Sequence, residues 1–300
     1  MNVTFKQLKL FKALADTGSV TAAARMMHIT QPTASMQLKE LANAIGCPLF
    51  EIIGKKIYLT SFGHELSSTA RRISNEWEYF EQHVSGIKGL TKGSLKIAIV
   101  STAKYFIPKM LGSFCEKYPD IDIALEVLNR DGVIKRLEQN MDDMYIMSMP
   151  PLNIEIEDEV FMPNPLVIIA AKQHPLSNKK SIELNELKNE RFILRELGSG
   201  TRTASAIQFK NKKFVPNIRL ELGSNESIKQ SVAAGLGLGL VSMHALNDYP
   251  YLEDISILNI NDFPIHSSWH IVTSTGKKLS PIAKIFHDHL LTEAKELSIV

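Results

Sequence analysis

The sequence has little cysteine and no long apolar run. Only Cys47 and Cys115 occur in 300 residues, which excludes a disulfide framework and a cysteine-based metal site. The longest apolar runs, such as residues 236–243, are far shorter than the roughly 20 residues that a membrane-spanning helix requires. The first residues contain no apolar segment of the signal-peptide type, and we therefore expect a cytoplasmic protein.

The sequence also lacks a large excess of charge, although its charge is unevenly distributed. The net charge is +2, and the hydrophobic fraction of 44% is that of a globular chain. Residues 1–60 contain seven Lys or Arg residues against three acidic ones, whereas residues 93–300 contain 23 basic and 25 acidic residues. A small basic head on a near-neutral remainder indicates that the head alone binds a polyanion.

Residues 1–60 predict three short helices followed by a hairpin. Gly18 and Gly46 end the first and third helices, Thr30 caps the third helix, and Pro32 falls in its first turn. One face of this third helix is polar, as in a helix that inserts side chains into the major groove of DNA. The alternative is an ordinary solvated face. The residues expected to contact DNA here are Thr30, Gln31, Pro32, Thr33, Ser35, Met36, Gln37 and Lys39.

A basic hairpin tip and a long helix strengthen the DNA-binding interpretation. Lys55 and Lys56 follow Gly54 at the tip, where they suit contacts to phosphate. In residues 61–90 the apolar side chains then recur at steps of three and four, close to a heptad pattern. This pattern predicts pairing between two chains. The alternative is a helix that lies on its own domain.

From residue 93 the pattern changes to alternating strands and helices, which predicts an α/β body with mostly parallel sheets. The expected strands are 95–100, 121–128, 145–147, 166–171, 192–194, 218–222, 239–242 and 269–273, and the expected helices are 103–117, 133–140, 202–212, 226–234 and 280–296. About 200 residues exceed the needs of one compact sheet. We therefore expect two lobes, divided near residues 163–165 and rejoined near 263–268.

Two turns in the body combine hydroxyl groups with the start of a helix. Ser101 and Thr102 follow the first strand, and residues 198–202 (Gly-Ser-Gly-Thr-Arg) precede a later helix. Free backbone N–H groups, hydroxyls and a guanidinium favour a small anion. We expect the turns to face each other across the cleft between the lobes. The alternative for each turn alone is a capped helix start, and for Arg130 a structural role is favoured over ligand binding.

Other suggestive features do not support catalysis. The glycines of residues 235–239 follow a helix and precede a strand, which is the reverse of a phosphate-binding loop. His287 and His289 lie two apart on a helix and cannot share a metal ion. The sequence therefore predicts no enzyme, no metal and no cofactor. A rival reading, an enzyme or solute-binding protein built on the same body, does not account for the basic head.

The chain resembles LysR-type transcriptional regulators over essentially its full length. The matching stretches are Phe11 to Ser19, Ala22 to Ala24, Thr30 to Ser35, Pro48 to Glu51, Leu59, Thr60 and Gly63. The resemblance implies a winged helix-turn-helix in residues 1–60, a dimerising linker helix in 61–90, and a periplasmic-binding-protein-like effector domain in 93–300. Lobe I would comprise 93–162 and 268–300, and lobe II 163–267. It further implies double-stranded DNA and RNA polymerase as partners, a small co-inducer, and a homotetramer. Ile52 departs from the arginine that many members carry.

The body more narrowly resembles regulators of RuBisCO operons. The residues that carry this likeness are Asn129, Arg130, Leu137 to Asn140, Asp143, Ile146, Met147, Pro150, Pro151, Asn164 to Leu166, His174 to Leu176, and Gly223 to Glu226. The subgroup implies a phosphorylated metabolite or NADPH as ligand, although the residues leave open a sugar phosphate, a dicarboxylate or a nucleotide. Ser148 and Met149 replace a glycine and a polar residue before Pro150. The expected effector-binding residues are Ser101, Thr102, Ser148, Met149, Ser199, Gly200, Thr201 and Arg202.

Overall fold

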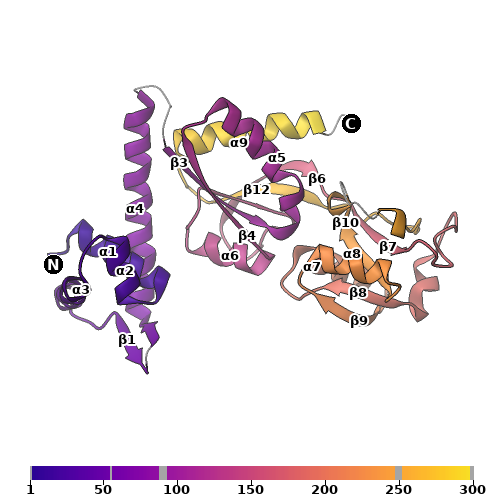
Figure 1. Cartoon of the computed structure of the whole chain (residues 1–300), viewed down its shortest axis with the longest axis horizontal. Coiled ribbons are helices and arrows are strands. Elements are labelled where there is room, and N and C mark those ends of the chain that lie inside the picture. The colour runs from indigo at the N-terminus through magenta and orange to yellow at the C-terminus, as the bar shows by residue number, and fades with distance from the viewer. Residues whose placement is uncertain (1, 55, 88–92, 247–251, 298–300) are drawn as a thin grey trace. The chain divides into compact units, whose positions relative to one another are not determined.

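The computed structural model describes residues 2–54, 56–87, 93–246 and 252–297 (Figure 1). These residues divide into two compact units. The first comprises the residues up to Val84 together with Gln139–Met141, and we call its part up to Val84 the head. The second unit comprises the other described residues, and we call its part from residue 93 the body. Each unit has its own hydrophobic core. Within the described ranges, no helix combines the length and apolar character that crossing a membrane would need.

The head contains three short helices, a hairpin and the start of a long helix. The helices are α1 (Phe5–Thr17), α2 (Val20–Met26) and α3 (Gln31–Ile45), the hairpin is β1 (Phe50–Ile53) with β2 (Lys56–Leu59), and the long helix is α4 (Ser61–Ile87). Apolar side chains from all three short helices meet in one core, which includes Leu10, Phe11, Leu14, Ala23, Ala34, Leu38 and Leu41. The core holds α3 by one face and leaves its other face to solvent.

The ends of these helices follow from local chemistry. Gly18 and Gly46 end α1 and α3 with φ of 61° and 88°, a left-handed conformation that glycine adopts without strain. The Thr30 hydroxyl accepts a hydrogen bond from the backbone N–H of Thr33, and Pro32 lies in the first turn of α3. The sequence predicted all four of these features.

The long helix α4 has two differently packed parts. Near its start, Leu66 packs against the head core, Ala70 is buried, and Arg71 pairs with Asp16 of α1. Beyond Ala70, large apolar side chains become exposed: Ile73, Trp77, Phe80 and Val84. The first part of α4 therefore contributes to the head core, and the part beyond Ala70 presents exposed apolar side chains.

The first sheet of the body has the strand order β4-β3-β5-β12-β6. Its strands are β3 (Gly93–Val100), β4 (Ile121–Leu128), β5 (Met144–Met147), β6 (Ile156–Pro163) and β12 (Ser268–Ser274). Helices α5 (Ile107–Lys117) and α9 (Pro281–Leu297) lie together over the sheet, and α6 (Arg130–Glu138) lies on its other side (Figure 1). A short 3₁₀ turn, η1 (Ser101–Tyr105), joins β3 to α5.

The second sheet has the strand order β11-β7-β10-β8-β9. Its strands are β7 (Leu166–Ala171), β8 (Arg191–Arg195), β9 (Asn217–Leu222), β10 (Leu238–Ser242) and β11 (Ile255–Ile257), with helices α7 (Gly200–Asn211) and α8 (Asn225–Ala233). Alternate residues of β7 belong to two separate apolar clusters, one including Phe209 of α7 and the other Ile228 of α8. The two helices therefore cover opposite faces of the sheet.

The chain crosses between the two sheets twice, and the crossings lie side by side. The backbone N–H of Asn164 donates to the carbonyl of Ser267 at 2.8 Å, and that of Leu166 donates to Ile265 at 3.0 Å. The buried Asn164 side chain accepts a hydrogen bond from Ser242 Oγ at 2.6 Å. Two adjacent connections of this kind form a hinge region between the sheets.

The predicted fold class, a helical winged head with a two-lobed α/β effector domain, is confirmed, with local corrections. The sheets are mixed rather than mostly parallel, since β12 and β7 run antiparallel to their neighbours. The sequence missed β6 and β11. Both are edge strands; β6 carries exposed acidic residues and β11 has only three residues. The helix predicted over 103–117 breaks at Phe106, because Pro108 starts a new helix.

Candidate functional site

The outer face of α3 presents a compact set of polar side chains. The opposite face is buried through Ala34, Leu38 and Leu41. The predicted DNA-contacting residues divide into the exposed Thr30, Gln31, Pro32, Ser35, Met36 and Lys39 and the half-buried Thr33 and Gln37. A rigid helix with this face free satisfies the steric requirement for entering a major groove.

Hydrogen bonds within the first turns of α3 organise this polar face. The hydroxyls of Thr30 and Thr33 lie 2.8 Å apart, and Gln31 Nε2 donates to Ser35 Oγ at 2.9 Å. The exposed Gln31 side chain also carries a carboxamide oxygen that can accept a hydrogen bond, and Met36 adds an exposed apolar tip that suits a thymine methyl group. The face can therefore offer both polar and apolar contacts to base edges.

The hairpin next to α3 supplies a basic side chain. Lys56 is exposed and is the first residue of β2, paired with Ile53, so it lies on the strand rather than at the tip. Lys55 lies outside the described residues. Ile52 is exposed on β1, where the resemblance led us to look for an arginine. A lysine on this hairpin can contact a phosphate group.

In the body, a small polar cavity with free space of about 10 Å³ lies between residues of the two sheets. Its walls come from η1, the start of α6, the end of β5, the end of β8 and the start of α7. The lining residues are Val100, Ser101, Thr102, Asn129, Arg130, Ser148, Arg195, Ser199, Gly200 and Thr201. Residues from both sheets therefore contribute to a single site.

The glycines of the 198–202 turn allow the two lobes to approach closely. A Cβ atom on Gly200 would lie 3.1 Å from both the carbonyl oxygen and the hydroxyl of Ser148. Gly198 has φ of +85°, and a Cβ there would collide with the Asp131 carboxylate. The Asp131 backbone N–H donates to the Gly198 carbonyl at 3.2 Å. Larger residues at either position would push the walls of the cavity apart.

The charge of the cavity favours an anion. Arg130 donates through Nε to the Met149 carbonyl at 2.7 Å and lies 3.9 Å from the nearest oxygen of Asp131. Arg195 is 2% exposed and makes a two-pronged pair with Glu196 at 2.8 and 3.0 Å. No carboxylate belongs to the described lining residues, whereas two guanidinium groups and five hydroxyls do. Such donors bind small anions.

The structure brings six of the eight predicted effector residues to this cavity and leaves two outside. Ser101, Thr102, Ser148, Ser199, Gly200 and Thr201 line it. Arg202 points away instead, donating to the Arg195 carbonyl at 3.0 Å and to Glu221 at 3.2 Å. Met149 packs its side chain against the core of the second sheet, with φ of +63°.

Sequence reasoning missed Asn129 and Arg195, and it assigned Arg130 to structure. The signal for Asn129 and Arg130 was present, since both belong to the stretches that resemble the RuBisCO-operon subgroup. Arg195 ends β8 just before the glycine turn and is buried by partners far along the chain, such as Ser101 at 3.2 Å. No local sequence pattern predicts that a residue of this kind lines the cavity.

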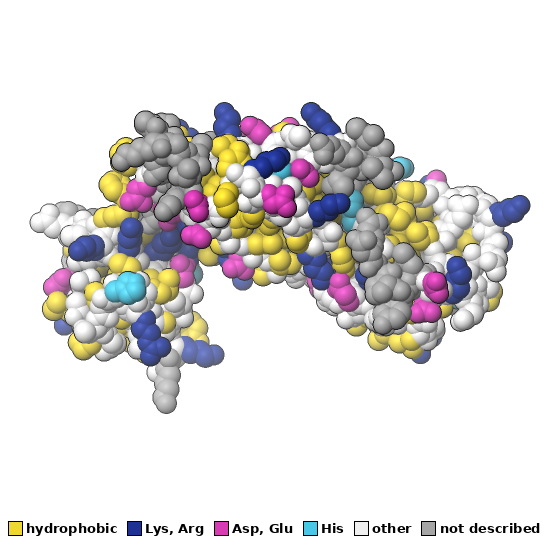
Figure 2. All heavy atoms as spheres, turned by 45° about the horizontal axis from the view of Figure 1, so that its top comes forward, with side chains coloured by type: hydrophobic (Ala, Val, Ile, Leu, Met, Phe, Trp, Pro, Cys, Tyr) yellow, Lys and Arg dark blue, Asp and Glu magenta, His cyan; other side chains and the backbone are white. Residues whose placement is uncertain are grey.

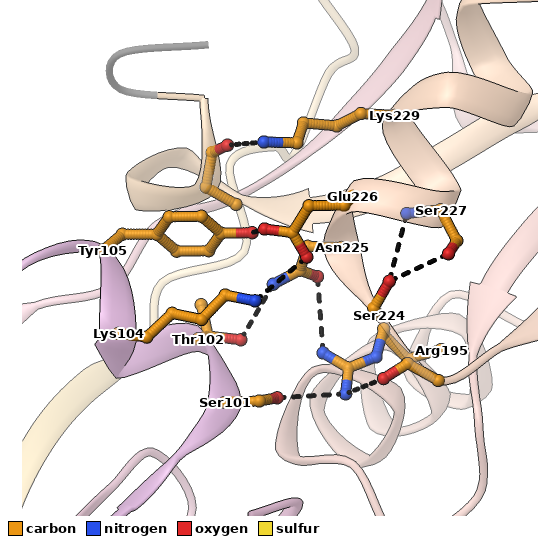
Figure 3. A network of polar contacts seen from close by, with 12 residues as sticks. Ser101, Thr102, Lys104, Tyr105, Arg195, Ser224, Asn225, Glu226, Ser227 and Lys229 are labelled. Carbon is orange, nitrogen blue, oxygen red and sulfur yellow. Dashed lines mark hydrogen bonds and ion pairs between the residues drawn. The ribbon is translucent and has the colours of Figure 1, made fainter. Parts of the chain in front are cut away.

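A second polar cluster lies beside the cavity (Figure 3). Asn225 Nδ2 donates to Thr102 Oγ1 at 3.1 Å, and the next residue, Glu226, accepts hydrogen bonds from the Tyr105 hydroxyl and from Lys104 Nζ, the latter at 3.0 Å. Burial raises the pKa of Tyr105 above its ordinary value, and the Glu226 carboxylate raises it further.

The carboxylate of Glu226 and the ammonium of Lys229 are also perturbed. Burial by itself would raise the pKa of Glu226, but hydrogen bonds from Tyr105 and Lys104 outweigh burial and lower it. Burial lowers the pKa of Lys229, whose Nζ donates to the Ala245 carbonyl at 2.7 Å. In the described parts of the chain, no group of His, Cys, Asp and Glu side chains could hold a metal ion.

Two family models match the chain and together cover both units. The model described as bacterial regulatory helix-turn-helix protein, lysR family, matches residues 5–64. The model described as LysR substrate binding domain matches residues 88–295.

Two characterised relatives align over nearly the whole length. The HTH-type transcriptional activator CmpR of a Synechocystis species is 41% identical over 298 residues, covering 99% of this chain and 98% of the relative. The RuBisCO operon transcriptional regulator of Acidithiobacillus ferrooxidans is 42% identical over 295 residues, with coverage of 98% and 96%. The predicted resemblance to RuBisCO-operon regulators is confirmed.

Solved structures agree with these matches. The regulatory domain of Synechocystis CcmR in complex with 2-PG is 43% identical, covers 69% of this chain and 99% of that chain, and superposes with a TM-score of 0.67. Full-length OxyR from Pseudomonas aeruginosa is 19% identical, and the alignment covers 98% of this chain and 95% of that chain. Its TM-score of 0.80 supports the fold. The chain therefore belongs to the LysR family of transcriptional regulators, with a helix-turn-helix head and an effector-binding body in place of an enzyme's catalytic site.

Proposed function

We propose that the protein binds operator DNA through residues 1–60, pairs through the helix of residues 61–90, and responds to a small anion held in the cavity of residues 93–300. In this proposal lobe I comprises residues 93–162 and 268–300, and lobe II comprises 163–267. The observation that carries the proposal is a cavity with two arginines and no lining carboxylate, formed by both lobes of a LysR-type body.

The size of the cavity narrows the ligand. Its free space of about 10 Å³ is roughly that of one water molecule, so the lining side chains must rearrange to admit an effector. A sugar phosphate fragment or a small dicarboxylate requires a smaller rearrangement than a nucleotide such as NADPH. Because a relative's regulatory domain was solved with 2-PG, we propose 2-PG or an anion of similar size and charge as the effector.

The walls of the cavity support a specific binding geometry. The start of α7 lies there without a side-chain cap, so that its N–H groups and positive helix end add to the charges of Arg130 and Arg195. Ser101 and Thr102 belong to the first lobe, and Ser199 and Thr201 to the second. An anion that accepts hydrogen bonds from both sets stabilises one angle between the lobes, and control of DNA binding follows if that angle suits one arrangement of the heads.

The exposed stripe on α4 supports the pairing of two chains. Ile73, Trp77, Phe80 and Val84 line one side of the helix, and Trp77 also stacks against Phe5 of α1 at 5.8 Å between ring centroids. A contiguous apolar stripe of this kind is costly in water and is buried by a second copy. We propose a homodimer through α4 and, by likeness to the family, a homotetramer that contacts RNA polymerase.

Operator binding with and without anion tests the proposal. The full chain is titrated onto DNA taken from upstream of its own gene, in the presence of 2-PG, of inorganic phosphate, or of neither. We expect tight, sequence-selective binding in every case and a change in affinity or footprint with 2-PG that an equal ionic strength of chloride does not reproduce. Selective DNA binding that no small anion alters would overturn the sensing part, and absence of selective binding would overturn the DNA-binding part.

A further inference from the structure

The polar cluster beside the cavity joins the two lobes without lining the ligand space. Lys104 and Tyr105 extend from η1 of the first lobe, and Glu226 extends from the start of α8 in the second lobe (Figure 3). We call Lys104, Tyr105 and Glu226 the interlobe clamp. None of the three belongs to the residues that line the cavity. The clamp therefore acts on the lobes rather than on a bound anion.

The clamp is connected to the cavity through neighbouring residues on both sides. On η1, Ser101 and Thr102 line the cavity and Lys104 and Tyr105 reach the clamp within the same short turn. On α8, Asn225 donates to Thr102, while the adjacent Glu226 closes the clamp. A single rotation about the hinge at Asn164 and Ser267 would make or break both sets of contacts.

The polar groups of the clamp are paired with one another. The Glu226 carboxylate accepts from a hydroxyl and an ammonium, and Lys229 Nζ lies 5.1 Å from the centroid of the Tyr105 ring, where a cation is attracted to the ring face. Tyr105 is desolvated, so its hydroxyl loses a partner if Glu226 is removed. The closed arrangement of the lobes thus has its own stabilising contacts.

We infer that Glu226 is a positioning residue for the effector site, one that holds the lobes closed through contacts separate from those of the effector. This inference rests on the proposed function, since it concerns the same cavity. A ligand that binds only the closed form has an apparent affinity reduced by the fraction of molecules that are closed. Glu226 raises that fraction, and so strengthens effector binding without touching the effector.

A matched pair of variants distinguishes the loss of an ion pair between the lobes from the loss of an ion pair within one lobe. Glu226→Ala removes the interlobe pair with Lys104. Glu186→Ala removes a pair with Lys179 that lies within the second lobe and is about equally exposed. Tyr105→Phe removes a single hydroxyl from the clamp and serves if Glu226→Ala fails to fold. All are made in the full chain.

Two readouts are measured on these proteins. The first is the ligand-free distance between the lobes, from spin labels on Glu116→Cys and Lys210→Cys with Cys47 and Cys115 replaced by serine and with excess unlabelled chain. The second is the affinity for 2-PG by calorimetry. We expect Glu226→Ala to lengthen and broaden the distance and to weaken 2-PG binding about tenfold, as when the closed fraction falls to roughly a tenth. Tyr105→Phe should do so less, and Glu186→Ala not at all.

The outcomes distinguish the clamp from the proposed ligand. If Glu226→Ala and Glu186→Ala give the same interlobe distance and the same affinity for 2-PG, the inference that Glu226 holds the lobes closed is overturned. A wider distance with unchanged affinity overturns the positioning role. If the wild-type chain does not bind 2-PG, the proposed ligand fails, and the ligand-free distances still decide whether Glu226 holds the lobes closed.

Discussion

The recognition face of α3 and the cavity of the body satisfy their polar side chains in opposite ways. On α3 the partners are three or four residues apart and exposed, as in Gln31 with Ser35. In the body the partners are 94 and 123 residues apart and mostly buried, as in Arg195 with Ser101 and Asn225 with Thr102. The polar face of α3 is formed by a single helix. The cavity is formed only when the two lobes are in contact.

This difference assigns the two regions different behaviour. In the proposed function, the α3 face meets DNA without rearrangement, so the affinity for DNA depends on the side chains themselves. The proposed anion site depends on the angle between the lobes, so the affinity for the anion includes the free energy of closing them. Over the visible face of the body, basic and acidic side chains are interspersed (Figure 2), which leaves no single-sign surface there to compete with the head for DNA. Substitutions in the head should therefore leave anion binding unaltered. Substitutions in the cavity should leave the contacts of the head with DNA unaltered.

The largest expected effect separates pairing from sensing. Changing Trp77→Glu and Phe80→Glu puts charges on the exposed stripe of α4 and should split the dimer. Loss of the paired heads should weaken operator binding on the order of 100-fold or more. Affinity for 2-PG should not change. Light scattering reports the mass, with Glu65→Gln on the same helix as control, and a double variant with wild-type mass would show that the stripe does not pair chains.

A smaller effect is expected on the recognition face, where the two side chains are coupled. Gln31→Ala or Ser35→Ala should each weaken specific operator binding by about 1–3 kcal/mol with the fold intact. Because Gln31 donates to Ser35, the double variant should lose less than the sum of the single losses. Fluorescence anisotropy on operator and scrambled DNA measures this. Additive losses would mean that the two residues act separately on the DNA.

The hairpin lysines should act on all DNA sequences alike. Changing Lys55 and Lys56 to alanine should reduce the slope of log affinity against log salt by up to about two units, since each phosphate contact contributes about 0.9. Discrimination between operator and scrambled DNA should stay the same. If selectivity for operator over scrambled DNA fell while the slope of log affinity against log salt stayed constant, the proposed role of the two lysines in phosphate contacts would be wrong.

The smallest effect concerns pH and the clamp in the body. The pKa of Glu226 is lowered from 4.5, so its contribution to closure is present above about pH 4.5 and is lost as the pH falls through the lowered value. The pKa of Tyr105 is raised from 10.0, so its contribution is present below about pH 10 and is lost only as the pH rises through the raised value. Lys104, Lys229 and Arg195 are the cations that face this pair. The interlobe distance should therefore be constant between about pH 6 and pH 9, and a transition inside that window would point to a different titrating group.

The head could be predicted from sequence far more completely than the cavity. Gly18, Gly46 and Thr30 fix helix ends through contacts within a few residues, and these contacts are visible in the sequence itself. The two turns predicted to bind an anion were identified by the same local logic, and residues of both line one cavity. The sequence did not predict which arginine faces the cavity, because Arg130 and Arg202 both lie at helix starts. Only the packing of one lobe on the other places Arg130 in the cavity lining and Arg202 against Glu221.

Long-range partners also explain the other misses. Arg195 and Glu226 gain their roles from Ser101, Lys104 and Tyr105, about 94 to 122 residues away along the chain, and no periodicity links such positions. The edge strand β6 was missed because its exposed acidic residues break the apolar alternation that marks a strand.

The most direct test of the central claim, an anion bound between the lobes, compares these two arginines. Arg130→Gln and Arg202→Gln are made in the full chain, and 2-PG is titrated by calorimetry. Removing a charged donor that lines the cavity should weaken binding about 10- to 100-fold for Arg130→Gln. Arg202→Gln should bind within about twofold of wild type, because its guanidinium contacts Glu221 instead. Equal losses in the two variants, or a loss confined to Arg202→Gln, would place the anion elsewhere and contradict the account.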